Sequence, residues 1–228
     1  MHATVSQPVV EADIDVSRPL TPGLVAEIAE ACDRVEDAGA GRVLVVRLNG
    51  SKAQPAAWPG PARMHLVGKW ENALRRLERI DALTVGLGAG RCNQACLEVL
   101  LATDHRIAGP GMALDAGTRT DGMWPGTVLY RLVQQVGLAT ARRLVLFPGE
   151  IDVPALRVAG VLDEVAQDAG AALAAVLKRA AASTGTETAL RRRLLLDAGT
   201  VSFEEALGTH LAACDRALRR TGPTKDSK

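Results

Sequence analysis

The residue best placed to do chemistry is Glu98, a carboxylate inside an otherwise apolar run. It belongs to the stretch CNQACLEVLLATDHRIAG, residues 92–109. A carboxylate positioned in an apolar, water-restricted pocket can act as a general acid or base. Burial raises the pKa of such a group and a helix N-terminus lowers it, and the sequence leaves open which effect is larger. The alternative role is a structural carboxylate paired with Arg91, Arg106 or Arg119.

Two thiols and a histidine in the same stretch, Cys92, Cys96 and His105, could also suggest a metal site. The two cysteines do not have the Cys-x-x-Cys spacing that is common in zinc sites, so we expect buried apolar thiols and no metal. His105 is expected on a strand as a hydrogen-bonded polar residue. The glycines from Gly86 to Gly90 lack the GxGxxG spacing of a dinucleotide site, so no cofactor is expected.

The elements that must position Glu98 alternate between strand and helix patterns. Period-two or β-branched runs predict strands at 9–16, 42–48 and 82–87, with one or two more between 105 and 117. Apolar positions at helical spacing predict helices from Pro22, at 64–80 and at 95–103, and the stretch 51–63 is a proline-rich loop. Such alternation favours a parallel sheet with a site at the carboxyl ends of its strands.

The rest of the chain has mainly helical patterns. We expect a helix pair at 127–146 around Gly137, a helix within 151–165 interrupted by Gly160, and two or three helices at 169–220. The last eight residues resemble a disordered tail.

Length and composition indicate one folding unit. The chain has 228 residues, 47% of them hydrophobic, and a net charge of +1 with acids and bases intermixed. No basic surface for nucleic acid, no membrane span and no export signal is visible, so we expect a soluble cytoplasmic protein with reduced thiols. We divide the chain into a core at 1–168, a helical region at 169–220 and a tail at 221–228.

The motifs together resemble a known family. TVGLGAGRCNQACLEVLLATDHRIAG, residues 84–109, is similar to the central segment of the enoyl-CoA hydratase/isomerase (crotonase) superfamily, in which a glycine-rich turn leads into a helix that carries an acid. Segments 121–126 and 131–146 resemble that family's Gly-x-x-Pro-Gly turn and the helix that follows it. Segment 151–165 resembles a later family segment with the pattern eA...Glv.ev. The resemblance covers about 9–220 and implies an α/β fold, a crotonase-like ββα superhelix with a C-terminal helical region.

The resemblance also implies a site for an acyl-CoA thioester, which is a substrate and not a cofactor. Its carbonyl oxygen would accept two backbone N–H bonds, one of them from Ala95 at a helix N-terminus. Glu98 follows one turn later on the same face and aligns with one catalytic glutamate. The second glutamate aligns with Thr118, which is flanked by Asp115 and Asp121 as possible replacements.

The chain departs from the family pattern at both oxyanion elements. Gln94-Ala95-Cys96 replaces three glycines, so the helix start either sits differently or never needed glycine. In the loop that supplies the second donor, the donor position is Pro61, which has no N–H. Gly60 or Ala62 could substitute through a shifted loop, or the stretch is a rigid connector.

Three further features have two interpretations each. Trp124 lies in the family's Pro-Gly turn and either walls the acyl pocket or packs in the core. Trp58 is on a loop and could cover a ligand or a partner. Residues 191–193 are three arginines that could meet CoA phosphates, although a solvated helix face is the simpler expectation.

Two functions follow from the resemblance. The first is an acyl-CoA hydratase or dehydratase, similar to the auxiliary hydratase-like proteins that aid dihydroxyphenylacetyl-CoA formation by a type III polyketide synthase in glycopeptide antibiotic biosynthesis. The second is a catalytically impaired accessory protein that binds a thioester product or the synthase. Family membership would imply a homotrimer or a hexamer, with the C-terminal helices docked on a neighbour.

Overall fold

The computed structural model describes residues 9–39, 41–115, 122–147, 151–181 and 186–221. Along the chain its strands are β1 (Val9–Asp15), β2 (Val43–Asn49), β3 (Leu83–Ala89), β4 (Arg91–Asn93), β5 (His105–Ala108), β6 (Ala113–Asp115) and β7 (Glu164–Val165). Its helices are α1 (Pro22–Ala38), α2 (Met64–Arg79), α3 (Gln94–Leu101), α4 (Val128–Val136), α5 (Leu138–Leu146), α6 (Val153–Val158), α7 (Ala169–Ala181), α8 (Thr186–Ala198) and α9 (Phe203–Thr221).

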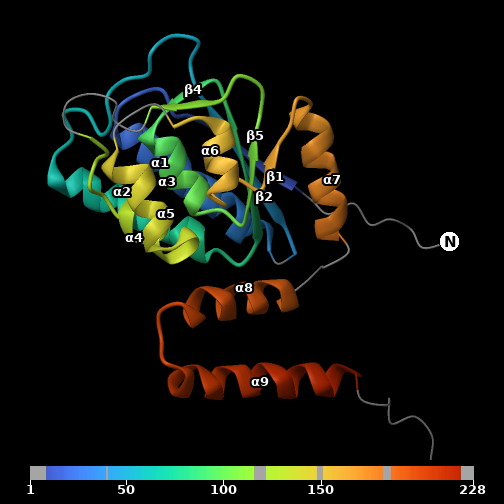
Figure 1. The fold of residues 1–228 in the computed structure, drawn as a ribbon. Helices are drawn as coiled ribbons and strands as arrows, with labels where there is room; N and C mark the ends of the chain where they lie inside the picture. Colours follow the sequence, from blue (N-terminus) through green and yellow to red (C-terminus); the bar gives the residue numbers. More distant parts are fainter. Residues whose placement is uncertain (1–8, 40, 116–121, 148–150, 182–185, 222–228) are drawn as a thin grey trace, which may run out of the picture.

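A five-stranded parallel sheet, in the order β1-β2-β3-β5-β7, forms the centre of the molecule (Figure 1). The side chains of β2 alternate between two cores, as the period of a strand requires. Leu44, Val46 and Leu48 face a large core shared with α1, α2 and α3, whereas Val43 and Val45 face a smaller core covered by α7. The apolar run at residues 43–46 therefore belongs to a strand that is buried on both faces.

Two glycines of β3 allow α3 to pack closely on the sheet. A Cβ at Gly86 would lie 2.8 Å from side-chain atoms of Leu100 on α3 and of Thr103 just after it. A Cβ at Gly88 would lie 3.4 Å from Sγ of Cys96 on α3 and 2.9 Å from the sulfur of Met112. Because no side chain intervenes, α3 is enclosed and all eight of its residues are buried. This enclosure removes Glu98 from bulk water.

The structure corrects two predicted elements. After the turn at Gly90, residues 91–93 form strand β4, which pairs in parallel with β6. The helix expected to continue past Gly160 ends before it, and Glu164–Val165 instead joins the sheet beside β5 as β7. Both short strands depend on partners distant in sequence, so local patterns did not reveal them.

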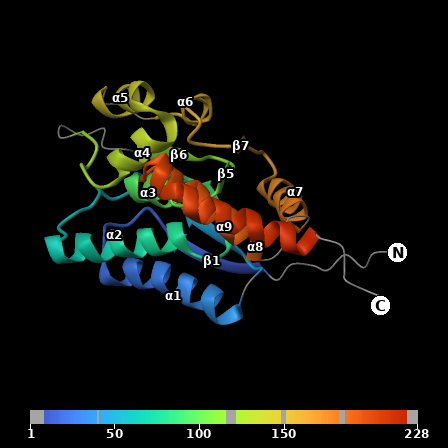
Figure 2. The same cartoon turned by 90° about the horizontal axis from the view of Figure 1, so that it is seen from below.

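The described residues of the C-terminal region form three helices, within the two or three expected. The first, α7, packs against the sheet, whereas α8 and α9 form a pair beyond the main body with α9 outermost (Figure 1). Figure 2 shows this pair from below, crossing under the rest of the molecule. No helix in the described ranges has the length and apolarity needed to cross a bilayer. The predicted tail lies outside the described residues except for Thr221, the last residue of α9.

Candidate active site

Glu98 lies on α3 and is 1% exposed. Its Oε2 accepts a hydrogen bond from Nε1 of Trp70 at 2.6 Å, and its Oε1 accepts bonds from Nε1 of Trp58 at 3.1 Å and Nε2 of Gln94 at 2.9 Å. All three donors are uncharged N–H groups. Among the described residues, the carboxylate of Glu98 is therefore stabilised by hydrogen bonds from neutral groups and not by a positively charged side chain.

Burial raises the pKa of Glu98 from an ordinary 4.5 to about 7, and the negative charge of Glu71 adds to the rise. The three N–H donors oppose it, because they stabilise the ionised form. Burial is thus the larger effect, which answers the question that the sequence left open. The carboxyl group changes charge near neutral pH, as a general acid or base requires.

The alternative ion pair is not formed with Arg106. Its guanidinium instead donates to the carbonyls of Thr103 and Val161 and to the side chain of Gln135. The side chain of Arg91 donates to Oε1 of Gln54. Arg119 lies outside the described residues.

Two tryptophans from different segments enclose Glu98. Trp70 is on the buried face of α2 and Trp58 is on the loop before it, and their rings pack edge to face with centroids 5.3 Å apart. The apolar periodicity at 64–80 predicts a helix with a buried face, which carries Trp70, but it does not reveal the contact of Trp70 with Glu98. The available signal was its indole N–H, because such a group requires a hydrogen-bond partner when it is buried.

The N-terminus of α3 is a regular helix start. Asn93 is its N-cap, and its Oδ1 accepts from the Ala95 N–H at 2.9 Å. Gln94, Ala95 and Cys96 are helical, so this helix start forms without glycine. The N–H predicted to bind a thioester oxygen is therefore engaged by Asn93 in this structure.

The loop at 51–63, which was proposed to supply the second backbone donor, lies beside Glu98. Its Trp58 donates a hydrogen bond to the carboxylate. Gly60 is exposed, with φ of 74°, and a Cβ there would lie 2.7 Å from Cβ of Pro19. Pro61 is exposed and Ala62 is half-buried against the core. Within the described part of the chain, the N–H groups of Gly60 and Ala62 have no hydrogen-bond acceptor.

Comparison with known proteins decides the family. The chain is 42% identical over 207 residues to an enoyl-CoA-hydratase of Amycolatopsis orientalis, an alignment covering 91% of this chain and 94% of the relative. The chain belongs to the enoyl-CoA hydratase/isomerase (crotonase) superfamily. No family model matches the chain.

Solved structures confirm the crotonase fold. An enoyl-CoA hydratase/isomerase from Marinobacter aquaeolei has a TM-score of 0.80 at 21% identity, covering 95% of this chain and 89% of its own. The structure of a putative enoyl-CoA hydratase from Thermobifida fusca in complex with CoA has a TM-score of 0.75 at 20% identity, covering 95% of this chain and 91% of its own.

Several residues assigned from the crotonase pattern stay predictions. Thr118 and Asp121 lie outside the described residues. Asp115 ends β6, and its carboxylate accepts from the side chain of Gln54. Trp124 is half-buried, and its backbone N–H and carbonyl both bond to the side chain of Gln94.

The two thiols and the histidine in the stretch around Glu98 are Cys92 and Cys96, which are buried, and His105, which is half-buried. Cys92 and Cys96 are fully buried, and the hydrogen bond with Cys92, together with burial, raises the pKa of Cys96. No group of three or more potential metal ligands occurs among the described residues. His105 lies on β5 as predicted, but its Nε2 is buried without a hydrogen-bond partner, which corrects the expectation that it is satisfied.

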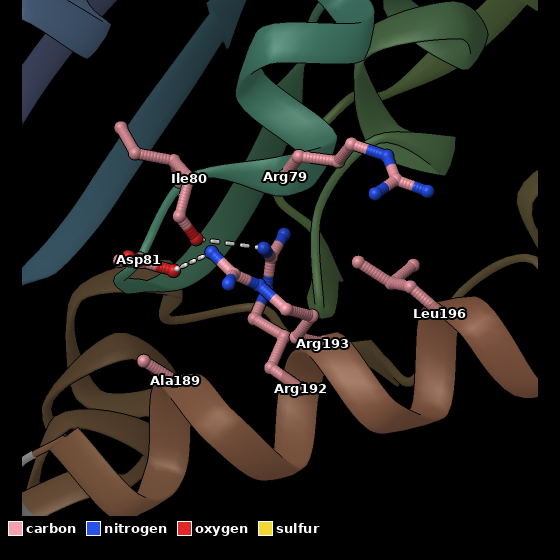
Figure 3. A pocket seen from close by; sticks show the side chains of 7 residues that line it. All are labelled: Arg79, Ile80, Asp81, Ala189, Arg192, Arg193 and Leu196. Atoms are coloured by element: carbon pink, nitrogen blue, oxygen red, sulfur yellow. Dashed lines mark hydrogen bonds and ion pairs between the residues drawn. The ribbon is translucent and has the colours of Figure 1, made fainter. Parts of the chain in front are cut away.

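The three arginines of α8 do not form the uniform solvated face that was expected. Arg192 is buried, with Nε 2.7 Å from both carboxylate oxygens of Asp104 and Nη1 2.8 Å from the carbonyl of Ile80. Arg193 is exposed and pairs with Asp81 at 3.3 Å. They line a cavity of about 230 Å³ between α8 and the end of α2 (Figure 3). Arg192 therefore docks α8 on the main body.

Proposed function

We propose that this chain is an acyl-CoA hydratase or dehydratase in which Glu98 moves the proton. The observation that carries the proposal is the setting of Glu98: a buried carboxylate held by three neutral N–H donors, with a pKa of about 7. The membership of the chain in the enoyl-CoA hydratase superfamily supports a thioester substrate.

The reaction needs one carboxyl group that alternates between two states. In hydration, ionised Glu98 takes a proton from water while the water oxygen bonds to Cβ of the enoyl thioester and the double-bond electrons move to the thioester oxygen. The protonated Glu98 then returns the proton to Cα. Dehydration is the reverse, and a pKa near neutrality keeps both states of Glu98 accessible.

The oxyanion formed in this reaction needs backbone donors. The Ala95 N–H is the first, and the thioester oxygen replaces Oδ1 of Asn93 as its acceptor. The second is the N–H of Gly60 or Ala62, both on the loop that carries Trp58, since Pro61 has no hydrogen to donate. The family resemblance assigns Trp124 and Asp121 to the binding of the acyl group, and Thr118 or a bound water to the assistance of Glu98. Thr118 and Asp121 lie outside the described residues, so their roles stay predictions.

We place the reaction in dihydroxyphenylacetyl-CoA formation, where a polyketide thioester must lose water to become aromatic. The resemblance of this chain's motifs to auxiliary hydratase-like proteins of that pathway supports the assignment. Dehydration is then the direction used, and a type III polyketide synthase supplies the substrate.

The capped Ala95 N–H favours a second candidate function. With Asn93 occupying one predicted donor and Pro61 unable to act as the other, the chain could bind a thioester product or a synthase without turnover. Purified protein would then alter the products of a type III polyketide synthase while showing no hydratase activity of its own.

A Glu98→Gln variant tests the primary proposal. We expect turnover of crotonyl-CoA to fall by at least about tenfold, because amide nitrogen cannot take the proton. Glu30→Gln, an exposed site on α1, is the matched control and should keep full activity. Unchanged turnover in Glu98→Gln would eliminate the acid–base role.

A further inference from the structure

Gln94 occupies the position where the family pattern has glycine, and its side chain is buried beside Glu98. It is 1% exposed and makes three hydrogen bonds. Its Oε1 accepts from the Trp124 N–H at 2.8 Å, and its Nε2 donates to the Trp124 carbonyl and to Oε1 of Glu98, each at 2.9 Å. A buried glutamine with every amide hydrogen in use has a specified orientation.

The backbone of Trp124 sets that orientation. A backbone N–H can only donate, so it must face Oε1 of Gln94, and the Trp124 carbonyl can only accept, so it must face Nε2. The second hydrogen of Nε2 then points at Glu98. Turning the amide over would place its oxygen against both the carbonyl and the carboxylate, leaving buried groups unpaired.

This arrangement treats the two oxygens of Glu98 differently. Oε1 accepts from both Gln94 and Trp58, which occupies the two lone pairs of a carboxylate oxygen. Oε2 accepts from Trp70 alone among the described residues, so one of its lone pairs is open. A proton binds more readily where no N–H competes for the lone pair.

The charged surroundings do not create this asymmetry. The charged group acting on Glu98 is Glu71 of α2, and it raises the pKa of the carboxyl group as a whole. Glu71 is itself bonded to Thr127 and to Arg131, which also pairs with Glu78. From α3, from the 51–63 loop and from the 122–127 turn, the groups that reach Glu98 are uncharged.

We propose that Gln94 is a positioning residue: oriented by the backbone of Trp124, it occupies Oε1 of Glu98 and leaves Oε2 as the oxygen that takes up and releases the proton. The proposal rests on the proposed function, since it assigns the proton of that reaction to one atom. It also links the 122–127 turn to the acid.

A Gln94→Met variant removes the amide at similar length. We expect the pKa of Glu98, followed by infrared absorption of its carboxyl group, to rise by about one pH unit or more, because a hydrogen bond to the charged form is lost. Gln134→Met, the same change at an exposed position of α4, should leave this pKa unchanged. The band is assigned by its absence from Glu98→Gln.

Kinetic measurements distinguish a positioning role of Gln94 from a general loss of structure in the variant. If the pKa rises by about one unit, crotonyl-CoA hydration at neutral pH falls about fivefold and recovers at higher pH, with KM little changed. If Gln94→Met does not fold, the NMR signals of the Gln94 side-chain amide in the unaltered protein must titrate with Glu98, and must not titrate in Glu98→Gln.

The outcomes distinguish the two proposals. An unchanged carboxyl pKa in folded Gln94→Met, or a Gln94 amide signal that ignores pH, overturns the role of Gln94 even if Glu98→Gln is inactive. Full turnover in Glu98→Gln overturns the proposed function, whether or not the infrared band shifts.

Discussion

Nε1 of Trp70 lies 2.6 Å from Oε2 of Glu98, so α2, which carries Trp70, supplies the shortest hydrogen bond to the acid. Trp70 is 28 residues earlier in the chain and is itself fully buried. The bond stabilises the ionised carboxylate, and it acts on the oxygen that we assign to proton transfer.

A Trp70→Phe variant should therefore lose stability in a pH-dependent way. We expect a loss of about 2 kcal/mol at alkaline pH from the missing bond to a charged acceptor, added to a packing loss common to all pH values. Urea unfolding at acidic and alkaline pH measures both. Trp58→Phe should show a smaller effect, because Trp58 is half-buried and water can replace its N–H. Equal losses of Trp70→Phe at both pH values would contradict the expectation.

The raised pKa of Glu98 makes the stability of the whole protein depend on pH. Its pKa is about 7 in the folded state against an ordinary 4.5, so the folded state binds the proton more tightly. The stabilising contribution is fully present below the lower value and is lost as pH rises through the higher one. We expect a decrease of about 3 kcal/mol in the free energy of unfolding across this window.

Glu98→Gln is the comparison for this pH dependence, since it has no proton to release. Urea unfolding curves of both proteins, taken through the window, should diverge as the pH rises. Parallel curves would mean that Glu98 titrates at its ordinary pKa.

Asn93 joins three segments and should not tolerate a carboxylate. Its Nδ2 donates to the carbonyls of Arg18 and Ala56, at 2.8 and 3.3 Å, while its Oδ1 caps the Ala95 N–H. Asn93→Asp keeps the cap but places a buried negative oxygen against two carbonyls. We expect a loss of about 3 kcal/mol or more by urea unfolding.

Asn72→Asp, at an exposed position of α2, is the control for this change and should stay within about 0.5 kcal/mol of the unaltered protein. If the two variants are equally stable, the Asn93 amide does not hold these segments together.

The outermost helix, α9, has an exposed apolar stripe of Phe203, Leu207, Leu211 and Leu218. We expect a neighbouring copy to cover it in a trimer or hexamer, because such a stripe is unfavourable in water. Leu211→Asp should shift the sedimenting species to the monomer, whereas Thr209→Asp, on the opposite face, should not. A monomeric unaltered protein would refute the assembly.

The sequence by itself determined the elements and the family. Strong local periodicity placed β2, α1 and α2, because each pattern reflects which side of its own element is buried. The order of the motifs around Glu98 predicted the crotonase fold, which the solved structures confirm.

Only the tertiary structure decided what surrounds the acid. Trp58 and Trp70 reach Glu98 from 40 and 28 residues away, and Gln94 is oriented by a turn 30 residues further along. The tertiary structure also decided two strand pairings between distant segments, that of β4 with β6 and that of β7 with β5. Local sequence records which residues are buried, but the hydrogen-bond partners of a buried group depend on how separate segments pack, and those partners set the pKa of Glu98 and the exposure of each of its oxygens.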